Sequence, residues 1–238
     1  MTICLYMKKL LLIVLLVPMM LFSQTNYEKA EKLFAQGKYS QAKPIFESIL
    51  AENPNHLKTL EYLGDIEGSN KSWDKAMTYY GKLKTLNPNN AEYYYKFGGC
   101  LGMKAKECNK FKALGMINDI KVNFEKAIQL NPNHIEARWA LIELYLQLPG
   151  IVGGSEHKAQ KYATELLKIS PVDGYLAKGH IAEYFNKYKE AEKQYSKAIT
   201  VSGSKTSYQK LADLYKNKMN QPEKAKTLLE NYQERNKS

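Results

Sequence analysis

Apolar side chains recur every three or four positions along most of the 238-residue chain. Residues 24–56 hold two such sets, one before Gly37 and one that begins at Tyr39. This spacing places the apolar residues on one face of a helix, so it predicts two helices that pack across a short turn. Comparable pairs of sets continue to the C-terminus, and the chain is therefore predicted to be all-α.

Marker residues return at a fixed distance, which indicates an internal repeat. Three pairs lie 34 positions apart: Ala42 and Ala76, Phe46 and Tyr80, and Pro54 and Pro88. A repeated small residue lets two helix backbones approach, and Asn-Pro ends a helix because proline disfavours helical geometry in the residue before it. When longer intervals are counted as insertions, the repeat continues through six units, at about 24–56, 57–90, 91–134, 135–171, 172–204 and 205–238.

These markers resemble the tetratricopeptide repeat family over about residues 24–234. The resemblance is carried by Leu63-Gly64, Trp73, Ala76 and Pro88 in the second unit, Phe97-Gly98, Leu101, Phe124, Ala127 and Pro132 in the third, and Gly179, Tyr188, Ala191, Tyr195 and Ala198 in the fifth. It implies an α-α superhelix, a solenoid of about six antiparallel helix pairs that occupies 24–238. In that fold the first helix of each pair lines a concave groove for a peptide or a partner's helix. The resemblance implies no catalytic residue and no cofactor.

The N-terminus has the pattern of a secretory signal peptide. Lys8 and Lys9 precede thirteen apolar residues, Leu10 to Phe22, and polar sequence begins at Ser23-Gln24. The pattern predicts cleavage after residue 23, with retention as a membrane anchor as the alternative. We therefore expect an exported bacterial protein of the Gram-negative type, in the periplasm or at the outer envelope.

Charge and residue chemistry narrow the function further. The formal net charge is +11, but lysines alternate with glutamates along the helices, which is typical of a solvated surface and argues against nucleic-acid binding. The four histidines fall in four different units, so no metal site is predicted. Cys100 and Cys108 are expected to be buried or half-buried free thiols, because a bridge would require the helix to end near Met103.

Two irregular segments interrupt the repeat. The ten extra residues of the third unit lie within 103–120 and predict two longer helices or, alternatively, a basic and apolar lip that contacts a partner. The turn at 149–155 is rich in glycine, with Ser155 as the expected N-cap and Ile151 and Val152 expected to pack against the next unit. Its glycines leave open a weaker alternative, an anion held by backbone amides.

The groove implied by the resemblance is the candidate site. Projecting its inward-facing pattern selects residues on each first helix, Tyr184 among them, and seven of these are expected to bind the partner: Tyr27, Glu61, Asp65, Tyr95, Trp139, Glu143 and His180. Aromatic anchors beside acids suit a peptide or helix with basic side chains, although the aromatics could instead pack between neighbouring units. The favoured function is a binding scaffold rather than an enzyme. The alternatives are a structural component of an envelope complex and a ligand-binding protein that uses the glycine-rich turn; the sequence leaves the oligomeric state open.

Overall fold

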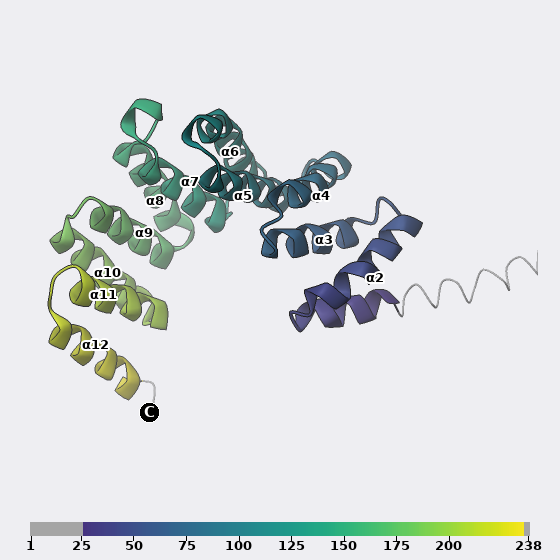
Figure 1. Ribbon diagram of the computed structural model, residues 1–238. Helices are drawn as coiled ribbons and strands as arrows, with labels where there is room; N and C mark the ends of the chain where they lie inside the picture. The colour runs from purple at the N-terminus through teal and green to yellow at the C-terminus, as the bar shows by residue number, and fades with distance from the viewer. Residues whose placement is uncertain (1–25, 236–238) are drawn as a thin grey trace, which may run out of the picture. The chain divides into compact units, whose positions relative to one another are not determined.

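The computed structural model describes residues 26–235, and every regular element in this range is a helix. The predicted signal peptide, 1–23, lies outside the described residues. A helical segment at 26–35 is followed by α2 (Tyr39–Glu52), α3 (Leu57–Ser69), α4 (Trp73–Leu86), α5 (Ala91–Glu107), α6 (Lys110–Leu130), α7 (Ile135–Gln147), the 3₁₀ turn η1 (Gly150–Val152), α8 (Glu156–Ile169), α9 (Pro171–Tyr184), α10 (Tyr188–Ser202), α11 (Lys205–Asn217) and α12 (Pro222–Arg235) (Figure 1). None of the helices at 26–235 is long and apolar enough to cross a bilayer.

The helices form two compact units, which divide between Cys108 and Asn109. Within each unit, helices that follow one another in sequence pack together, as in α3 with α4 and α9 with α10. The division falls at the α5–α6 turn, inside the predicted third repeat. Both helices beside it are long, with 17 residues in α5 and 21 in α6 against 13 to 15 in the other α-helices that have complete bounds. The predicted lengthening of these two helices is confirmed.

Helix boundaries follow from local chemistry. Helices α2, α4 and α6 each end immediately before an Asn-Pro pair. The helices that follow are capped by His56, Asn90 and His134, whose side chains accept a hydrogen bond from an amide in the first turn. No role was predicted for His56 and His134 from the sequence, and the structure shows that both act as helix N-caps.

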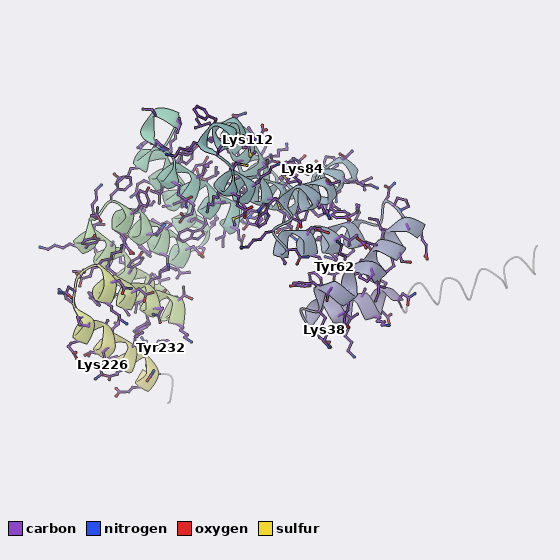
Figure 2. All side chains as sticks on the ribbon, in the orientation of Figure 1. Lys38, Tyr62, Lys84, Lys112, Lys226 and Tyr232 are labelled. Carbon is purple, nitrogen blue, oxygen red and sulfur yellow. The ribbon has the colours of Figure 1, made fainter. Side chains whose placement is uncertain are left out.

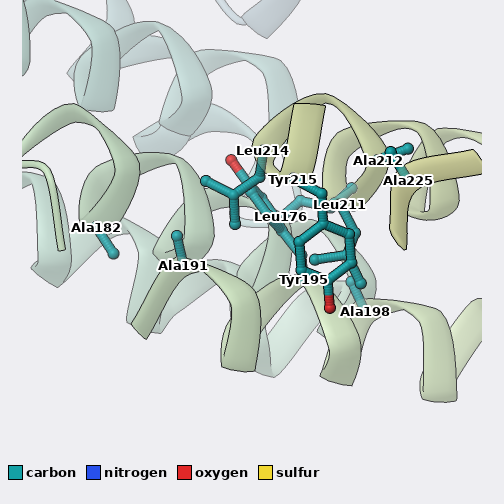
Figure 3. Close-up of a cluster of buried hydrophobic side chains, with 10 residues drawn as sticks. All are labelled: Leu176, Ala182, Ala191, Tyr195, Ala198, Leu211, Ala212, Leu214, Tyr215 and Ala225. Carbon is teal, nitrogen blue, oxygen red and sulfur yellow. The ribbon is translucent and has the colours of Figure 1, made fainter. Parts of the chain in front are cut away.

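Each unit has its own packed core. The marker alanines are fully buried, among them Ala42, Ala76 and Ala191, so the predicted close approach of helix backbones is confirmed. In unit 2, side chains from α9, α10, α11 and α12 form one cluster around the fully buried ring of Tyr195 (Figure 3).

Cys100 and Cys108, the cysteines within the described residues, are free thiols, as predicted. Helix α5 continues past Cys100 to Glu107, so Cys100 is held within the helix while Cys108 stands at its end. Burial, reinforced by the nearby Asp65 carboxylate, raises the pKa of Cys100 to about 11. This thiol is therefore protonated at neutral pH and is a poor nucleophile.

Candidate functional site

In unit 1, two predicted groove residues, Glu61 and Asp65, both pair with one lysine, Lys96, on the first helix of the following hairpin. Lys96 Nζ on α5 lies 2.9 Å from Glu61 Oε1 and 2.8 Å from Asp65 Oδ1, both on α3. The side chains of Lys96 and Glu61 are 20% and 15% exposed, so this pairing is largely shielded from water. Both carboxylates are thus occupied within the chain.

Two further groups complete this cluster. The buried Tyr80 hydroxyl donates to Asp65 at 2.6 Å, and the exposed Lys58 ammonium lies 3.0 Å from Glu61 Oε2. Burial alone would raise the pKa of Glu61, but hydrogen bonds from Lys96 and Lys58 outweigh it and lower the pKa below its ordinary value. Glu61 is therefore ionised at neutral pH.

Tyr27 stands among aromatic rings at the N-terminal end of unit 1. Its ring meets Phe46 edge-on at 6.2 Å and His56 at 5.3 Å between centroids. Nearby, the Tyr62 hydroxyl donates to Glu31 at 2.9 Å, and burial together with this bond raises the pKa of Tyr62 to about 12 (Tyr62 is labelled in Figure 2). Tyr27 is half-buried and contributes packing as well as surface.

Tyr95 is the remaining predicted residue of unit 1. It lies on α5 immediately before Lys96 and is half-buried. The structure therefore brings Glu61 and Asp65 together through Lys96, with Tyr95 next to that lysine in sequence.

In unit 2, the three predicted residues come together on neighbouring first helices. His180 Nε2 on α9 lies 2.6 Å from Glu143 Oε1 on α7, and the rings of His180 and Trp139 are 6.3 Å apart. The side chains of His180 and Glu143 are 30% and 41% exposed, so this cluster is partly open to solvent, although the His180 Nε2 atom itself is buried. We call Trp139, Glu143 and His180 the α7–α9 cluster.

Two further residues adjoin the α7–α9 cluster: Asp173, which the groove pattern did not select, and Tyr184, which it did. Asp173 accepts a hydrogen bond from the Trp139 indole N–H at 3.1 Å, and Tyr184 stands 48% exposed four residues after His180. Trp139 also packs against the core cluster of unit 2, so it does lie between neighbouring hairpins. The separation of Trp139 from Asp173, 34 residues, is one repeat period and could have revealed this bond from sequence.

The α7–α9 cluster is suited to recognition. It offers an aromatic surface, a partly exposed carboxylate and an imidazole on two rigid helices. Within residues 26–235, no group of three or more His, Cys, Asp or Glu side chains could hold a metal ion.

The glycine-rich turn uses its own amides. The amides of Val152 and Gly154 donate to the Pro149 carbonyl, that of Gly153 donates to Gly150, and that of Ser155 donates to Tyr145. Ser155 is the N-cap of α8, as predicted, and its hydroxyl accepts from the Lys158 amide at 3.2 Å. These four amides are occupied within the turn and are therefore not available to an anion.

The prediction that Ile151 packs against the next unit is wrong, because its side chain is 97% exposed. Val152 is half-buried. The loop closes on itself through its backbone bonds, so no side-chain contact is needed to hold it, and the apolar residue at its tip is left in solvent.

Gly153 gives this turn a testable feature. Its φ of +105° lies in a region that residues with a Cβ rarely enter, so Gly153→Ala is expected to lower the free energy of unfolding by about 1 kcal/mol. Thermal unfolding followed by circular dichroism should show a melting temperature lower by about 2–4 °C. Gly150→Ala is the matched control, since an added Cβ there meets no atom within 4 Å. Equal melting temperatures for the two variants would contradict the strain assigned to Gly153.

Comparisons with known proteins agree with the helix-hairpin architecture. Models described as tetratricopeptide repeat match residues 33–96, 172–204 and 206–237, which together make up more than half of the chain. The chain belongs to the tetratricopeptide repeat family. The prediction from the marker residues is thereby confirmed at the level of the family.

Individual relatives are distant. A curated relative, "Protein CTR9 homolog" of Arabidopsis thaliana, is 28% identical over 155 residues, which cover 63% of this chain but only 13% of the plant protein. Among solved structures, the tetratricopeptide repeat protein TTC0263 of Thermus thermophilus has a TM-score of 0.63 at 18% identity and covers 81% of this chain and 98% of its own.

Two other solved structures are similar in fold. YrrB, described as having an unusual peptide-binding site, has a TM-score of 0.52 at 16% identity, over 76% of this chain and 87% of its own. PilW, described as a type IV pilus biogenesis factor, has a TM-score of 0.62 at 15% identity, over 87% of this chain and 90% of its own. At these identities the likeness extends to the fold alone.

Proposed function

We propose that this tetratricopeptide repeat protein is a scaffold that binds a protein or peptide partner through the first helices of its hairpins, without catalysing a reaction. The observation that carries the proposal is the α7–α9 cluster, which presents an indole, an imidazole and a partly exposed carboxylate from two adjacent first helices. YrrB, of similar fold, is described as having a peptide-binding site, which is consistent with this use of the surface.

The charges favour a partner segment with a basic side chain. In unit 1, Glu61 and Asp65 are already paired with Lys96, so a ligand would have to displace a shielded ammonium there. In unit 2, Glu143 pairs with His180 and accepts a hydrogen bond from Gln147, and Asp173 accepts from Trp139 and Ser170, but the Glu143 side chain is 41% exposed. A lysine or arginine of the partner can therefore approach Glu143 from solvent while an apolar residue covers Trp139. The partner site is therefore proposed in unit 2.

The test selects ligands without assuming their identity. A random peptide library is panned against residues 24–238, and the selected peptides are titrated by calorimetry against wild type and Trp139→Ala. We expect selected peptides that carry lysine or arginine near an apolar residue, and an affinity about tenfold lower for Trp139→Ala, because a buried aromatic contact contributes at least about 1.4 kcal/mol. Phe111→Ala, an exposed aromatic outside the cluster, is the control and should bind as wild type.

Selected peptides without basic residues, or with equal affinity for Trp139→Ala, would contradict this proposal.

We further propose that the chain is exported to the periplasm or the outer envelope, after cleavage of residues 1–23. The proposal rests on the charged and apolar N-terminal sequence, and PilW, a protein of pilus biogenesis, has a similar fold. Cell fractionation with N-terminal sequencing tests it. A mature chain that begins at residue 24 in the envelope fraction is expected, and a full-length chain in the cytoplasm would contradict it.

A further inference from the structure

Unit 2 exposes large apolar side chains at the ends where its hairpins turn. Phe111 at the start of α6 is 88% exposed, Leu114 one turn later is 43% exposed, and Ile151 in the α7–α8 loop is 97% exposed. Phe185, at the α9–α10 turn, is 37% exposed. We call these four residues the turn edge of unit 2.

These residues share one edge because the chain reverses direction at each short connection. Helices α6, α8 and α10 all begin at this edge, since the helices between them return the chain to it. A direct contact joins two of the ends: Lys187 Nζ, in the α9–α10 turn, lies 2.5 Å from Glu156 Oε1 at the first residue of α8. The same ammonium lies 5.5 Å from the centre of the Phe185 ring.

Helix α6 projects beyond its neighbour at this edge. The Tyr162 hydroxyl of α8 donates to Glu125 of α6 at 3.3 Å, which fixes the level at which the two helices meet. Glu125 is 15 residues into α6, whereas Tyr162 is only 6 residues into α8. At about 1.5 Å per residue, the start of α6 extends about 13 Å past the start of α8. The first two turns of α6, with Phe111 and Leu114, therefore stand out on the side where the loop carries Ile151.

The turn edge is basic as well as apolar. Within the described chain, Lys110 and Lys112 have no ion-pair partner, and Figure 2 labels Lys112 on α6. Lys158 lies at the start of α8 with its ammonium 5.3 Å from the Tyr145 ring, again without a carboxylate among the described residues. Glu156, the acidic residue beside it, is engaged by Lys187. Phe111 thus lies between two lysines in sequence, and Ile151 lies in the loop that leads into α8, whose first turn carries Lys158.

We propose that the turn edge of unit 2 binds the surface of an anionic lipid bilayer, with Phe111 and Ile151 inserted among the headgroups. Single apolar side chains on projecting ends, each beside lysines, match the composition of a bilayer interface, where apolar atoms enter the acyl boundary and ammonium groups meet anionic headgroups. A protein partner would instead favour a recessed patch that packs around its anchoring residues. The proposed peptide site is centred on Trp139, Glu143 and His180. Its neighbour Tyr184 contacts Phe185 of the turn edge at 5.3 Å between ring centroids, so the two surfaces adjoin and are tested with different residues.

Vesicle co-sedimentation tests the proposal with residues 24–238, which include all residues of the three core clusters and omit the apolar N-terminal segment. The probes are vesicles of phosphatidylcholine alone and of phosphatidylcholine with about 30 mol% phosphatidylglycerol. We expect binding to the anionic vesicles, weakened by salt, and at least about a tenfold loss of partitioning for the double variant Phe111→Glu, Ile151→Glu. Lys110→Ala should reduce the preference for anionic vesicles by about fivefold.

The matched control is Val122→Glu, Val201→Glu. These residues are 50% and 51% exposed in the same unit and are not among the four residues of the turn edge, and the control introduces the same two charges. It should bind vesicles about as strongly as wild type, as should Trp139→Ala, so failure of the peptide site and failure of the bilayer site are distinguishable. Equal partitioning of the edge variant and this control would overturn the proposal. So would absence of vesicle binding, including the case in which sedimentation velocity shows a dimer that the edge variant loses, because the occupant would then be a second copy.

Discussion

Replacing Lys96 with methionine is expected to lower the free energy of unfolding by about 3 kcal/mol at pH 7. Lys96 lies between Glu61 and Asp65, and its removal leaves two largely shielded carboxylates without their common counter-charge. Breaking a buried pair on one side is far more costly than losing an exposed pair, because the remaining charge stays desolvated. Urea unfolding of wild type and variant measures the difference.

The matched control is the same lysine-to-methionine substitution at a second partner of Glu61. Lys58 also pairs with Glu61 but its side chain is 58% exposed, so Lys58→Met should cost less than about 1 kcal/mol. Similar losses for the two variants would show that burial around Lys96 does not control the energetics.

The stability lost in Lys96→Met should become smaller at acidic pH. In wild type, the pKa of Glu61 is below its ordinary value of 4.5, so its contribution to stability is present above that pH and is lost as the pH falls through the lowered pKa. Without Lys96, only Lys58 opposes the effect of burial, so the pKa of Glu61 is higher in the variant than in wild type, and the variant loses less stability than wild type as the pH falls. The difference in unfolding free energy should therefore shrink between pH 7 and about pH 4.5, and a constant difference would contradict this account.

A second large loss of stability is expected for Gly179→Ala, which adds only one methyl group. An added Cβ would lie 2.4 Å from Cε1 of Tyr195, a ring that is fully buried and whose hydroxyl donates to Glu183 at 2.8 Å. The ring cannot retreat without breaking that bond or compressing its neighbours, and overpacking of this kind costs about 1–3 kcal/mol. After the helix propensity gained by alanine, we expect a net loss of about 2 kcal/mol in urea unfolding.

Gly115→Ala is its control within unit 2. Position 115 is also helical, but an added Cβ meets no atom within 4 Å, so this change should be neutral or stabilise by about 0.5–1 kcal/mol. Opposite signs for two chemically identical substitutions would isolate the ring contact. A Gly179→Ala variant as stable as wild type would mean that the Tyr195 ring has room to move.

Much of the architecture could be predicted because it depends on local rules. Periodic apolar residues, Asn-Pro stops and the recurring alanines are each read within a few positions, and the helix boundaries and the buried alanines agree with them. The N-terminal segment at 26–35 carries less of the marker pattern, yet its Ala30 is fully buried against α2 and α3.

For the candidate site, the sequence predicts which face of the helices carries it but not which side chains pair there. Repeat spacing indicates that Glu61, Asp65 and Trp139 point to the same side of their helices, but it does not state which side chain from the next hairpin will meet them. Lys96 and Asp173 supply those partners, at separations of 35 and 34 residues. Ile151 was predicted wrongly for a related reason, since hydrophobicity favours burial while the backbone bonds of its loop make burial unnecessary.

The hydrogen bonds that cross from one hairpin to the next also limit how hairpins of this protein can be exchanged. Tyr62 donates to Glu31, Lys96 to Glu61 and Tyr215 to Glu192, so at each of these junctions a carboxylate of one hairpin is bonded by a different side chain of the next. Hairpins of one template are therefore not interchangeable here. Deleting, duplicating or shuffling one would leave a carboxylate facing the wrong neighbour, even where the apolar markers match.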